Sequence, residues 1–432
     1  MDYQQSRAYV KDADRYAGGA LDLTNIKELM KRLGNPQDQL KYVHVAGTNG
    51  KGSVIAYLYT TLSEAGYRVG RYISPSVYSY REKMEVAGSA VSREQFAGYV
   101  TRVAAAIKEM TTEGLAHPTP FEIETAVAFL FFAEEKCDLV ILEVGMGGNL
   151  DATNIIRNTV LAVLVPISMD HQAFLGNTLA EITQKKAGII KPGCSVVTVG
   201  QRPETMEVIR EVCREKGADL TETDLSSAKA VKEDFAGQTL EYRGETYELS
   251  LAGSYQTENA ALALDALEVL NHKGYPTTVE QRKKGLKDTK WNGRLTIIHR
   301  EPLFIVDGAH NPAAADMLED SVRKYFKGRK LFFIMGVFRD KDYPYIIRKL
   351  CPYAEQIITI ETPDNPRALP AQELAEEVKK CNPHVQAADS IPDAVDKIFA
   401  MAGREDVILS FGSLSFIGEI TTIVKTQEEK NS

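Results

Sequence analysis

A glycine-rich segment, VHVAGTNGKGSV at residues 43–54, has residue types that bind phosphate groups. Its spacing departs from the usual G-x-x-x-x-G-K-[ST] pattern, because Val45 stands at the first glycine position and Ser53 comes one residue late. In such a loop, backbone N–H groups and the N-terminus of the next helix face an anion, while Lys51 contacts the outer phosphates and Ser53 reaches Mg²⁺. A tight turn without a ligand is the alternative interpretation.

Other polar residues follow apolar runs that we predict to be parallel β-strands. Ser74 follows VGRYI, Glu143 lies near the end of DLVILEV, and His171 follows VLAVLVPI. The carboxyl ends of parallel strands meet at one sheet edge, where ligands bind, so we expect these side chains to converge on the loop Gly47–Ser53. A carboxylate is costly to bury unless it is paired or holds a metal ion, although Glu143 could also cap a helix. His171 could bind magnesium, polarise a substrate or be structural.

Further along the chain, several residues keep two interpretations. Asp151 could contact a substrate or cap a turn. Lys185 and Lys186 lie near the end of a predicted helix, where the dipole favours cations, so their spacing alone favours a solvated helix end. Gln256 and Asn259 could read an adenine edge or cap a helix.

Asp307 and His310 follow the predicted strand in PLFIVDG. They could belong to a site, or the segment could be a helix N-cap with Pro312 in the first turn.

The composition excludes several classes of protein. The chain has 432 residues, of which 44% are hydrophobic and 25% charged, as expected for a folded protein of two or more domains. Its net charge of −8 does not favour nucleic acid. The five scattered cysteines lack metal-ligand spacing and indicate free thiols in a reducing cytosol. The sequence shows no signal peptide, membrane span or heptad seam, so we predict a cytoplasmic monomer.

Short apolar runs alternate with helical patterns, which predicts an α/β fold with mostly parallel sheets. The predicted strands are 42–46, 69–73, 138–144, 160–167, 195–200, 302–308, 330–336, 356–361 and 406–412. Helices are predicted at 53–66, 121–136 and 258–274. Alternating segments between 228 and 252 predict a small antiparallel β patch. We therefore predict an N-terminal domain at 1–294, a hinge near its end, and a C-terminal Rossmann-like α/β domain at 295–432.

Several motifs occur together in the order of one family. They are GTNGKGSV (47–54), SP (74–75), EVGMGGNLDATN (143–154), DH (170–171), KAGIIKPG (186–193), GSYQTENA (253–260), GR (293–294) and DGAHNP (307–312). With this combination the chain resembles the folylpolyglutamate synthase/dihydrofolate synthase family, within the Mur-type ATP-dependent amide ligases, over nearly its whole length. The shifted loop is that family's form of the P-loop, so the resemblance implies an N-terminal P-loop ATPase domain.

The resemblance also implies a role for each matching residue. The ATP contacts are Gly47, Thr48, Asn49, Gly50, Lys51, Gly52, Ser53, Gln256, Asn259, Arg294 and Asp307. Two Mg²⁺ sites would use Ser53, Ser74, Glu143, His171 and a carbamate on Lys186, with K⁺ as a further cation. The implied catalytic residues are Lys51, Glu143, His171, Lys186 and His310. The pterin end matches Asp22, Thr24, Phe121, Glu122 and Asp151.

The chain departs from the family pattern at Ile73, Ser76, Asn149 and Asn292. The first three lie near the expected folate and metal region, so they leave the preferred substrate open. The resemblance implies ATP-dependent ligation of L-glutamate to a folate, to dihydropteroate, or to both, through an acyl phosphate. A related ligase for another acid and amino acid, and a nucleotide-binding module without ligase activity, are the alternatives.

Overall fold

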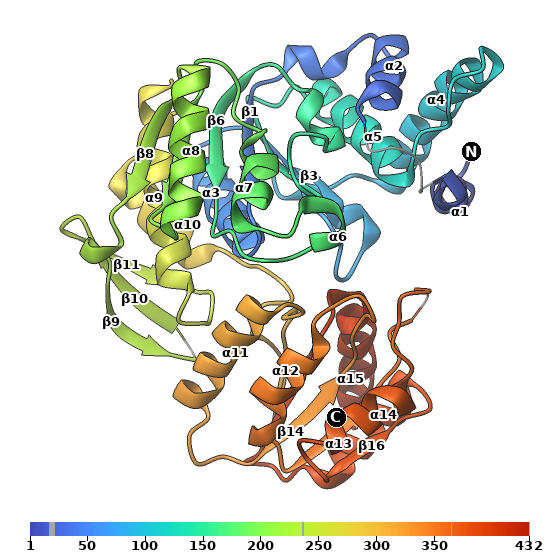
Figure 1. Cartoon of the computed structure of the whole chain (residues 1–432), viewed down its shortest axis with the longest axis vertical. Helices are drawn as coiled ribbons and strands as arrows, with labels where there is room; N and C mark the ends of the chain where they lie inside the picture. Colours follow the sequence, from blue (N-terminus) through green and yellow to red (C-terminus); the bar gives the residue numbers. More distant parts are fainter. Residues whose placement is uncertain (17–21, 236, 364, 432) are drawn as a thin grey trace.

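The computed structural model describes residues 1–16, 22–235, 237–363 and 365–431, which form two α/β domains along the long axis of the molecule (Figure 1). Elements coloured blue to yellow make the N-terminal domain, and orange to red elements make the C-terminal domain. No helix within these described ranges is long and apolar enough to cross a membrane.

The central sheet of the N-terminal domain has eight strands within the described residues. In spatial order they are β4 (Ser89–Ala90), β3 (Met84–Val86), β2 (Val69–Tyr72), β5 (Leu139–Glu143), β1 (Tyr42–Ala46), β6 (Thr159–Leu164), β7 (Ser195–Val199) and β8 (Asp219–Thr223). Neighbours from β2 to β8 pair in parallel, whereas β3 and β4 pair antiparallel at one edge. All five predicted strands of this domain are confirmed. The sequence missed β3, β4 and β8, because they are short or half-exposed and lack an apolar run.

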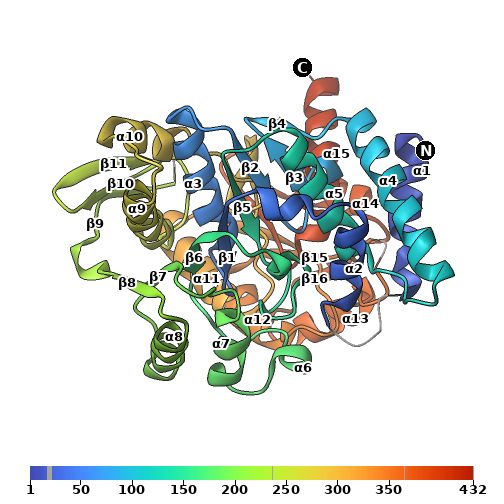
Figure 2. The same ribbon diagram turned by 90° about the horizontal axis from the view of Figure 1, so that it is seen from above.

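Helices cover both faces of this sheet, which explains why its strands read as continuous apolar runs. One face packs against α3 (Lys51–Glu64), α9 (Gln256–His272) and α10 (Val279–Asp288). The other packs against α1 (Tyr3–Asp12), α2 (Thr24–Arg32), α4 (Arg93–Thr112), α5 (Pro120–Glu134), α7 (Leu179–Ala187) and α8 (Pro203–Lys216), with the short α6 (Gln172–Leu175) nearby. Figure 2 shows α3, α9 and α10 on one side and α1, α4 and α5 on the other. Side chains alternate along β1, since Tyr42 packs with α5 whereas Val43 and Val45 pack with α3.

A small antiparallel sheet follows, as the sequence predicts. Within the described residues its strands are β9 (Lys229–Asp234), β10 (Gly237–Tyr242) and β11 (Glu245–Leu249), with β10 in the centre. It lies beside the C-terminal domain in Figure 1. Phe235, which follows β9, contacts Tyr325 and Phe326 of that domain.

The C-terminal sheet has six strands in the described part of the chain. In spatial order they are β12 (Thr296–Arg300), β13 (Leu303–Val306), β17 (Val407–Phe411), β14 (Leu331–Met335), β15 (Gln356–Thr359) and β16 (Val385–Ala387), and only β12 pairs antiparallel among them. The helices are α11 (Pro312–Tyr325), α12 (Tyr343–Leu350) and α13 (Ala371–Lys379) on one face, with α14 (Ile391–Met401) and α15 (Ile417–Asn431) on the other. This is the predicted Rossmann-like arrangement. We place the domain boundary at 294–295 as a proposal, since β12 is the first strand of the second sheet.

Candidate functional site

The phosphate-loop segment connects β1 to α3, with α3 beginning at Lys51. Gly50 has a φ of +98°, and a Cβ there would lie 2.6 Å from Oδ1 of Asn259. A Cβ on Gly52 would lie 2.3 Å from the ring of Trp291. A side chain at either position would clash with these neighbours, so both positions require glycine. A glycine-rich turn without packed neighbours would carry no such requirement.

The polar side chains of this loop are held in place by other parts of the chain. Lys51 Nζ donates to the carbonyl oxygens of Gly47 (3.3 Å) and Thr48 (3.2 Å) and lies 3.9 Å from the Glu143 carboxylate. The buried Ser53 Oγ accepts a hydrogen bond from Gln256 Nε2 at 3.1 Å. Gln256 thus supports the serine hydroxyl and does not stand free to read a base.

A cavity at the carboxyl edge of the N-terminal sheet gathers all five predicted catalytic residues. Its lining includes Gly47, Thr48, Asn49, Lys51, Gly52, Ser74, Glu143, Asp170, His171, Lys186, Trp291, Arg294 and His310. The strand-end argument is therefore confirmed for the residues that follow β1, β2, β5 and β6. Glu143 Oε2 accepts a hydrogen bond from the Ser74 N–H at 3.1 Å. Burial raises the pKa of Glu143, while Lys51 and that hydrogen bond act in the opposite direction.

Lys186 lies in the last turn of α7, buried beneath the phosphate loop. Its Nζ donates to the Gly47 carbonyl oxygen at 2.8 Å. Burial, assisted by the charge of Lys51, lowers the pKa of Lys186 to about 7. Spacing alone predicted a solvated helix end for both lysines, and this is wrong for Lys186, because the loop folds over it. Lys185 instead donates to the Phe174 carbonyl oxygen at 2.6 Å near the surface.

His171 is the N-cap residue of α6 and lies in the left-handed backbone region, at a φ of +51°. Burial lowers its pKa, although Asp170, 3.9 Å from His171 Nε2, acts in the opposite direction. The imidazole is therefore neutral near pH 7 and has a nitrogen lone pair to offer.

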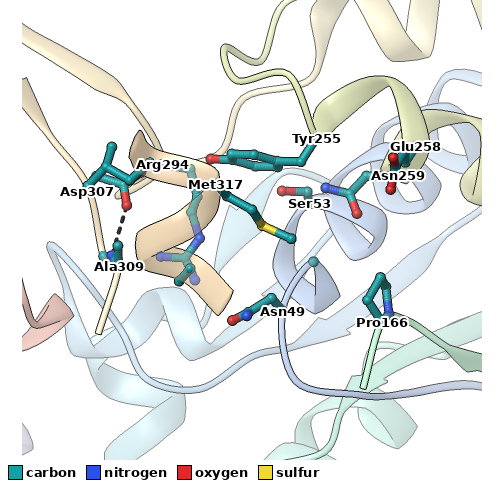
Figure 3. Close-up of a pocket in the computed structure, with 14 residues that line it drawn as sticks. Asn49, Ser53, Pro166, Tyr255, Glu258, Asn259, Arg294, Asp307, Ala309 and Met317 are labelled. Atoms are coloured by element: carbon teal, nitrogen blue, oxygen red, sulfur yellow. Dashed lines mark hydrogen bonds between the residues drawn. The ribbon is translucent and has the colours of Figure 1, made fainter. Parts of the chain in front are cut away.

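A second cavity lies between the domains (Figure 3). It is lined by Asn49, Gly50, Ser53, Pro166, Tyr255, Glu258, Asn259, Arg294, Asp307, Gly308, Ala309, Ala314, Met317 and Leu318. Its apolar wall suits a flat ring, and its polar end reaches the phosphate loop. Ser53 opens here, whereas Glu143 and His171 line the first cavity. Asn49 and Arg294 line both, so the two cavities adjoin.

The C-terminal loop residues are fixed by their own backbone. The Asp307 carboxylate accepts from the N–H groups of Leu295 (2.9 Å) and Ala309 (2.8 Å). His310 Nδ1 lies 2.7 Å from the Gly308 carbonyl oxygen, so Nδ1 carries the proton and Nε2 is the acceptor. Burial lowers the pKa of His310 to about 4. The N-cap of α11 is Asn311, whose Oδ1 accepts from the Ala314 N–H at 2.9 Å.

The residues matched to the pterin end make internal contacts. Asp22 accepts from the Thr24 N–H at 2.7 Å, and Glu122 caps α5 by accepting from the Thr119 N–H at 2.7 Å. Asp151 accepts from the N–H of Met146 at 2.9 Å and from Thr153. A Cβ on Gly145 would lie 2.7 Å from the Phe121 ring.

Among the described residues lining the two cavities, none is one of these five: Asp22, Thr24, Phe121, Glu122 and Asp151. Phe121 and Asp151 lie one layer behind, against the cavity residues Gly145 and Met146.

The donor set suits magnesium better than a metal held by protein side chains alone. Within the described ranges, no group of three or more His, Cys, Asp or Glu could hold a metal ion. Mg²⁺ normally keeps several waters and binds substrate phosphates with one or two protein ligands. A serine hydroxyl, a buried carboxylate and a neutral imidazole beside a phosphate loop fit that pattern.

Sequence reasoning missed Trp291, Asn311 and Lys341, which lie at these cavities or beside them. Trp291 is the only tryptophan of the chain, and its neighbours Gly293 and Arg294 belong to a motif, but nothing local places its ring on Gly52. Lys341 meets Asp170 only because the two domains come together. No spacing in the sequence reports such a contact.

Two protein families match the chain, the Mur ligase middle domain over residues 45–267 and the glutamate ligase domain of Mur ligases over residues 293–414. The chain is 35% identical to the dihydrofolate synthase/folylpolyglutamate synthase of Bacillus subtilis, covering 98% of this chain and 99% of that protein. Its structure is similar to Mycobacterium tuberculosis folylpolyglutamate synthase complexed with ADP, with a TM-score of 0.88, 31% identity, and coverage of 98% and 99% of the two chains. E. coli FolC in complex with DHPP and ADP gives a TM-score of 0.84 at 28% identity, with coverage of 99% and 98%.

These relatives match the chain from end to end, and the shifted phosphate loop and the DGAHNP segment both lie at the cavities. The chain therefore belongs to the folylpolyglutamate synthase/dihydrofolate synthase family of Mur-type ligases.

Proposed function

We propose that this protein is an ATP-dependent ligase that joins L-glutamate to a folate, to dihydropteroate, or to both. The observation that carries the proposal is the pair of adjoining cavities. One has an apolar wall and opens on Ser53, and the other gathers Glu143, His171 and Lys186 at the same phosphate loop. A protein that binds nucleotide without ligase activity has no need of Glu143, His171 and Lys186 in the second of these cavities.

The chemistry requires an activated carboxylate. The γ-phosphoryl group of ATP is transferred to a carboxylate oxygen of the pterin substrate, giving an acyl phosphate and ADP. The amino group of glutamate then attacks the acyl carbon, the C–O bond to phosphate breaks, and a proton is released. No protein nucleophile is needed, so the chain acts by positioning and by charge neutralisation.

We propose that particular residues of the chain carry out these tasks. Backbone N–H groups of the Gly47–Ser53 loop and the N-terminus of α3 face the phosphates, and Lys51 offsets the charge of the transferred group. Arg294, at the domain boundary, and His310, in the C-terminal domain, line the first cavity. Together the domains keep water from the acyl phosphate.

We assign Ser53 to one Mg²⁺ site and Ser74, Glu143 and His171 to a second. Bound Mg²⁺ would neutralise phosphate charge and orient the transferred group. Lys186, with its pKa of about 7, has the neutral amine that reacts with CO₂ to give a carbamate, and this supports the second site. We extend the proposal to K⁺ as a further cation and to a monomeric protein.

The pterin substrate faces the wall of the first cavity that Gly145 and Met146 form. Phe121 and Asp151 shape the wall formed by Gly145 and Met146, so they act on the substrate through that wall. Ile73 and Ser76 flank Ser74, and Asn149 follows the glycine-rich segment. These departures affect the choice between reduced folate and dihydropteroate.

A paired assay tests the function. ADP release is measured with L-glutamate and either tetrahydrofolate or dihydropteroate, and the new amide is detected by mass. We expect release with at least one pterin, abolished in Lys51→Met, which lacks the cation at the loop. No release above background with either pterin would reject the substrate assignment, and a wider panel of acids and amino acids would then test for a related ligase.

A further inference from the structure

The two domains meet at places far apart in the sequence. Phe235 lies with its ring centroid 5.3 Å from that of Phe326, the residue that follows α11. On the opposite side, Val77 touches Gly418 on α15 so closely that a Cβ on Gly418 would lie 2.1 Å from the Val77 carbonyl oxygen. A third contact reaches the phosphate loop, and it is made of polar side chains.

Asp170 is the centre of this third contact. It belongs to the segment after β6 in the N-terminal domain, yet its carboxylate is bonded by the C-terminal domain. Oδ1 accepts from Lys341 Nζ at 2.8 Å, and Oδ2 accepts from Asn311 Nδ2 at 3.1 Å. The side chains of Asp170 and Lys341 are only 10% and 9% exposed. Solvent therefore screens this pair far less than an ordinary surface ion pair.

Asn311 carries the contact to the phosphate loop. Asn49 Nδ2 donates to Asn311 Oδ1 at 3.1 Å, and Asn311 Nδ2 donates back to Asn49 Oδ1 at 3.2 Å. Asn311 Oδ1 also caps α11 through the Ala314 N–H. A rigid helix end, a phosphate-loop residue and a buried ion pair are thus joined through one amide.

The same contact lies next to groups assigned to the reaction. His310, the neighbour of Asn311, has its Nε2 4.0 Å from Asp170 Oδ2. Asn49 lines both cavities, together with Arg294 at the domain boundary. The position of the C-terminal domain, and with it of His310, is therefore tied to the loop through Asn311, which Asp170 holds.

We propose that Asp170, Asn311 and Lys341 form an interdomain latch that holds His310 over the phosphate loop. These are positioning residues, because they act through the placement of a domain. The latch rests on the proposed function only in requiring a nucleotide between the domains. In this latch Lys341 and Asp170 act across the domain interface and not within their own domains.

The test measures domain position directly. Cys381 in the C-terminal domain is the exposed thiol among the five cysteines, and Lys108→Cys on the exposed face of α4 gives the second label in the N-terminal domain. Pulsed electron paramagnetic resonance then records the interdomain distance with a non-hydrolysable ATP analogue and Mg²⁺. The variants are Asp170→Asn, Lys341→Met and their combination, each checked for wild-type circular dichroism.

We expect a single narrow distance distribution for the wild type and a shifted or broadened one for both single variants. Loss of one partner of a buried charged hydrogen bond should weaken binding of the analogue about 10- to 100-fold. The double variant should be no worse than the poorer single one, because both remove the same contact. Lys341→Arg, which keeps the charge, should restore most of the affinity.

Arg339→Met is the matched control. Arg339 lies two residues from Lys341, but its partner Glu373 is exposed and belongs to the same domain. Its removal should leave the distance distribution unchanged. If Asp170→Asn and Lys341→Met also leave it unchanged, the latch is overturned, whatever happens to activity. Fully additive losses in the double variant would overturn it as well. Neither readout requires ligase turnover, so failure of the latch is distinguishable from failure of the proposed function.

Discussion

Replacing Lys186 with methionine should stabilise the protein near neutral pH. Its pKa of about 7, against the ordinary 10.5, corresponds to a cost of about 5 kcal/mol for holding the charged form in the folded chain. Below pH 7 the lysine is charged in both folded and unfolded chains, so the full cost applies. Above pH 7 the folded chain loses this proton first, and the cost falls until it disappears above pH 10.5.

Methionine has a similar length and no charge, so it removes this cost. The lost hydrogen bond to the Gly47 carbonyl offsets only about 1 kcal/mol, and Lys51 still donates to that oxygen. Before that offset, the gain from methionine should be about 4 kcal/mol at pH 7 and about 1 kcal/mol at pH 9.5.

Urea unfolding at both pH values measures this, in CO₂-free buffer so that no carbamate changes the charge. Lys185→Met, one residue away and outside the buried site, should change stability little at either pH. An equal gain from Lys186→Met at both pH values would refute the reasoning.

Other predictions concern the cavities. His171→Ala should lower kcat on the order of 100-fold or more, because loss of a direct metal ligand should reduce activity at least as much as loss of a group that orients such a ligand. ATP should still bind to this variant, which titration calorimetry checks. An unchanged kcat would favour a binding module. Ser53→Ala leaves Gln256 Nε2 without its buried acceptor and should cost about 1–3 kcal/mol of stability, which thermal unfolding measures. The variant should also need a higher Mg²⁺ concentration for activity, which an Mg²⁺ titration measures. Gly52→Ala should cost about 1–3 kcal/mol by clashing with Trp291, and Trp291→Leu in the same chain should recover part of it. Carbon-13 bicarbonate should give a carbamate signal in the wild type that is missing in Lys186→Arg and grows as pH rises through about 7; the same signal in both proteins would contradict the assignment.

Apolar strand runs predicted most of the fold. Nine strand predictions all correspond to observed strands, and the antiparallel patch near 228–252 is present as β9 to β11. Among the missed strands, β8 and β16 are half-exposed, so their residues show no apolar run. The polar segment from Lys425 is helical to Asn431, because α15 continues from the apolar segment that packs on the sheet.

For the site, local motifs identified the residues but not their burial. Lys185 and Lys186 are equivalent in spacing, and only the loop folded over α7 separates a buried amine from an exposed one. Ser53 was expected in one hollow with Glu143 and His171, whereas it opens into an adjoining one. The serine hydroxyl accepts a hydrogen bond from Gln256 on α9, a residue 203 positions away in the chain.

The sequence by itself determined the strand ends at which Ser74, Glu143 and His171 lie, because the spacing of apolar residues and the residue types are local properties of the chain. The tertiary structure decided which of those ends share a cavity, how far burial lowers the pKa of Lys186, and that Asp170 meets Lys341 across the domains. These depend on desolvation and on contacts between distant segments. Both arise only once the packed chain excludes water from groups that the sequence keeps apart.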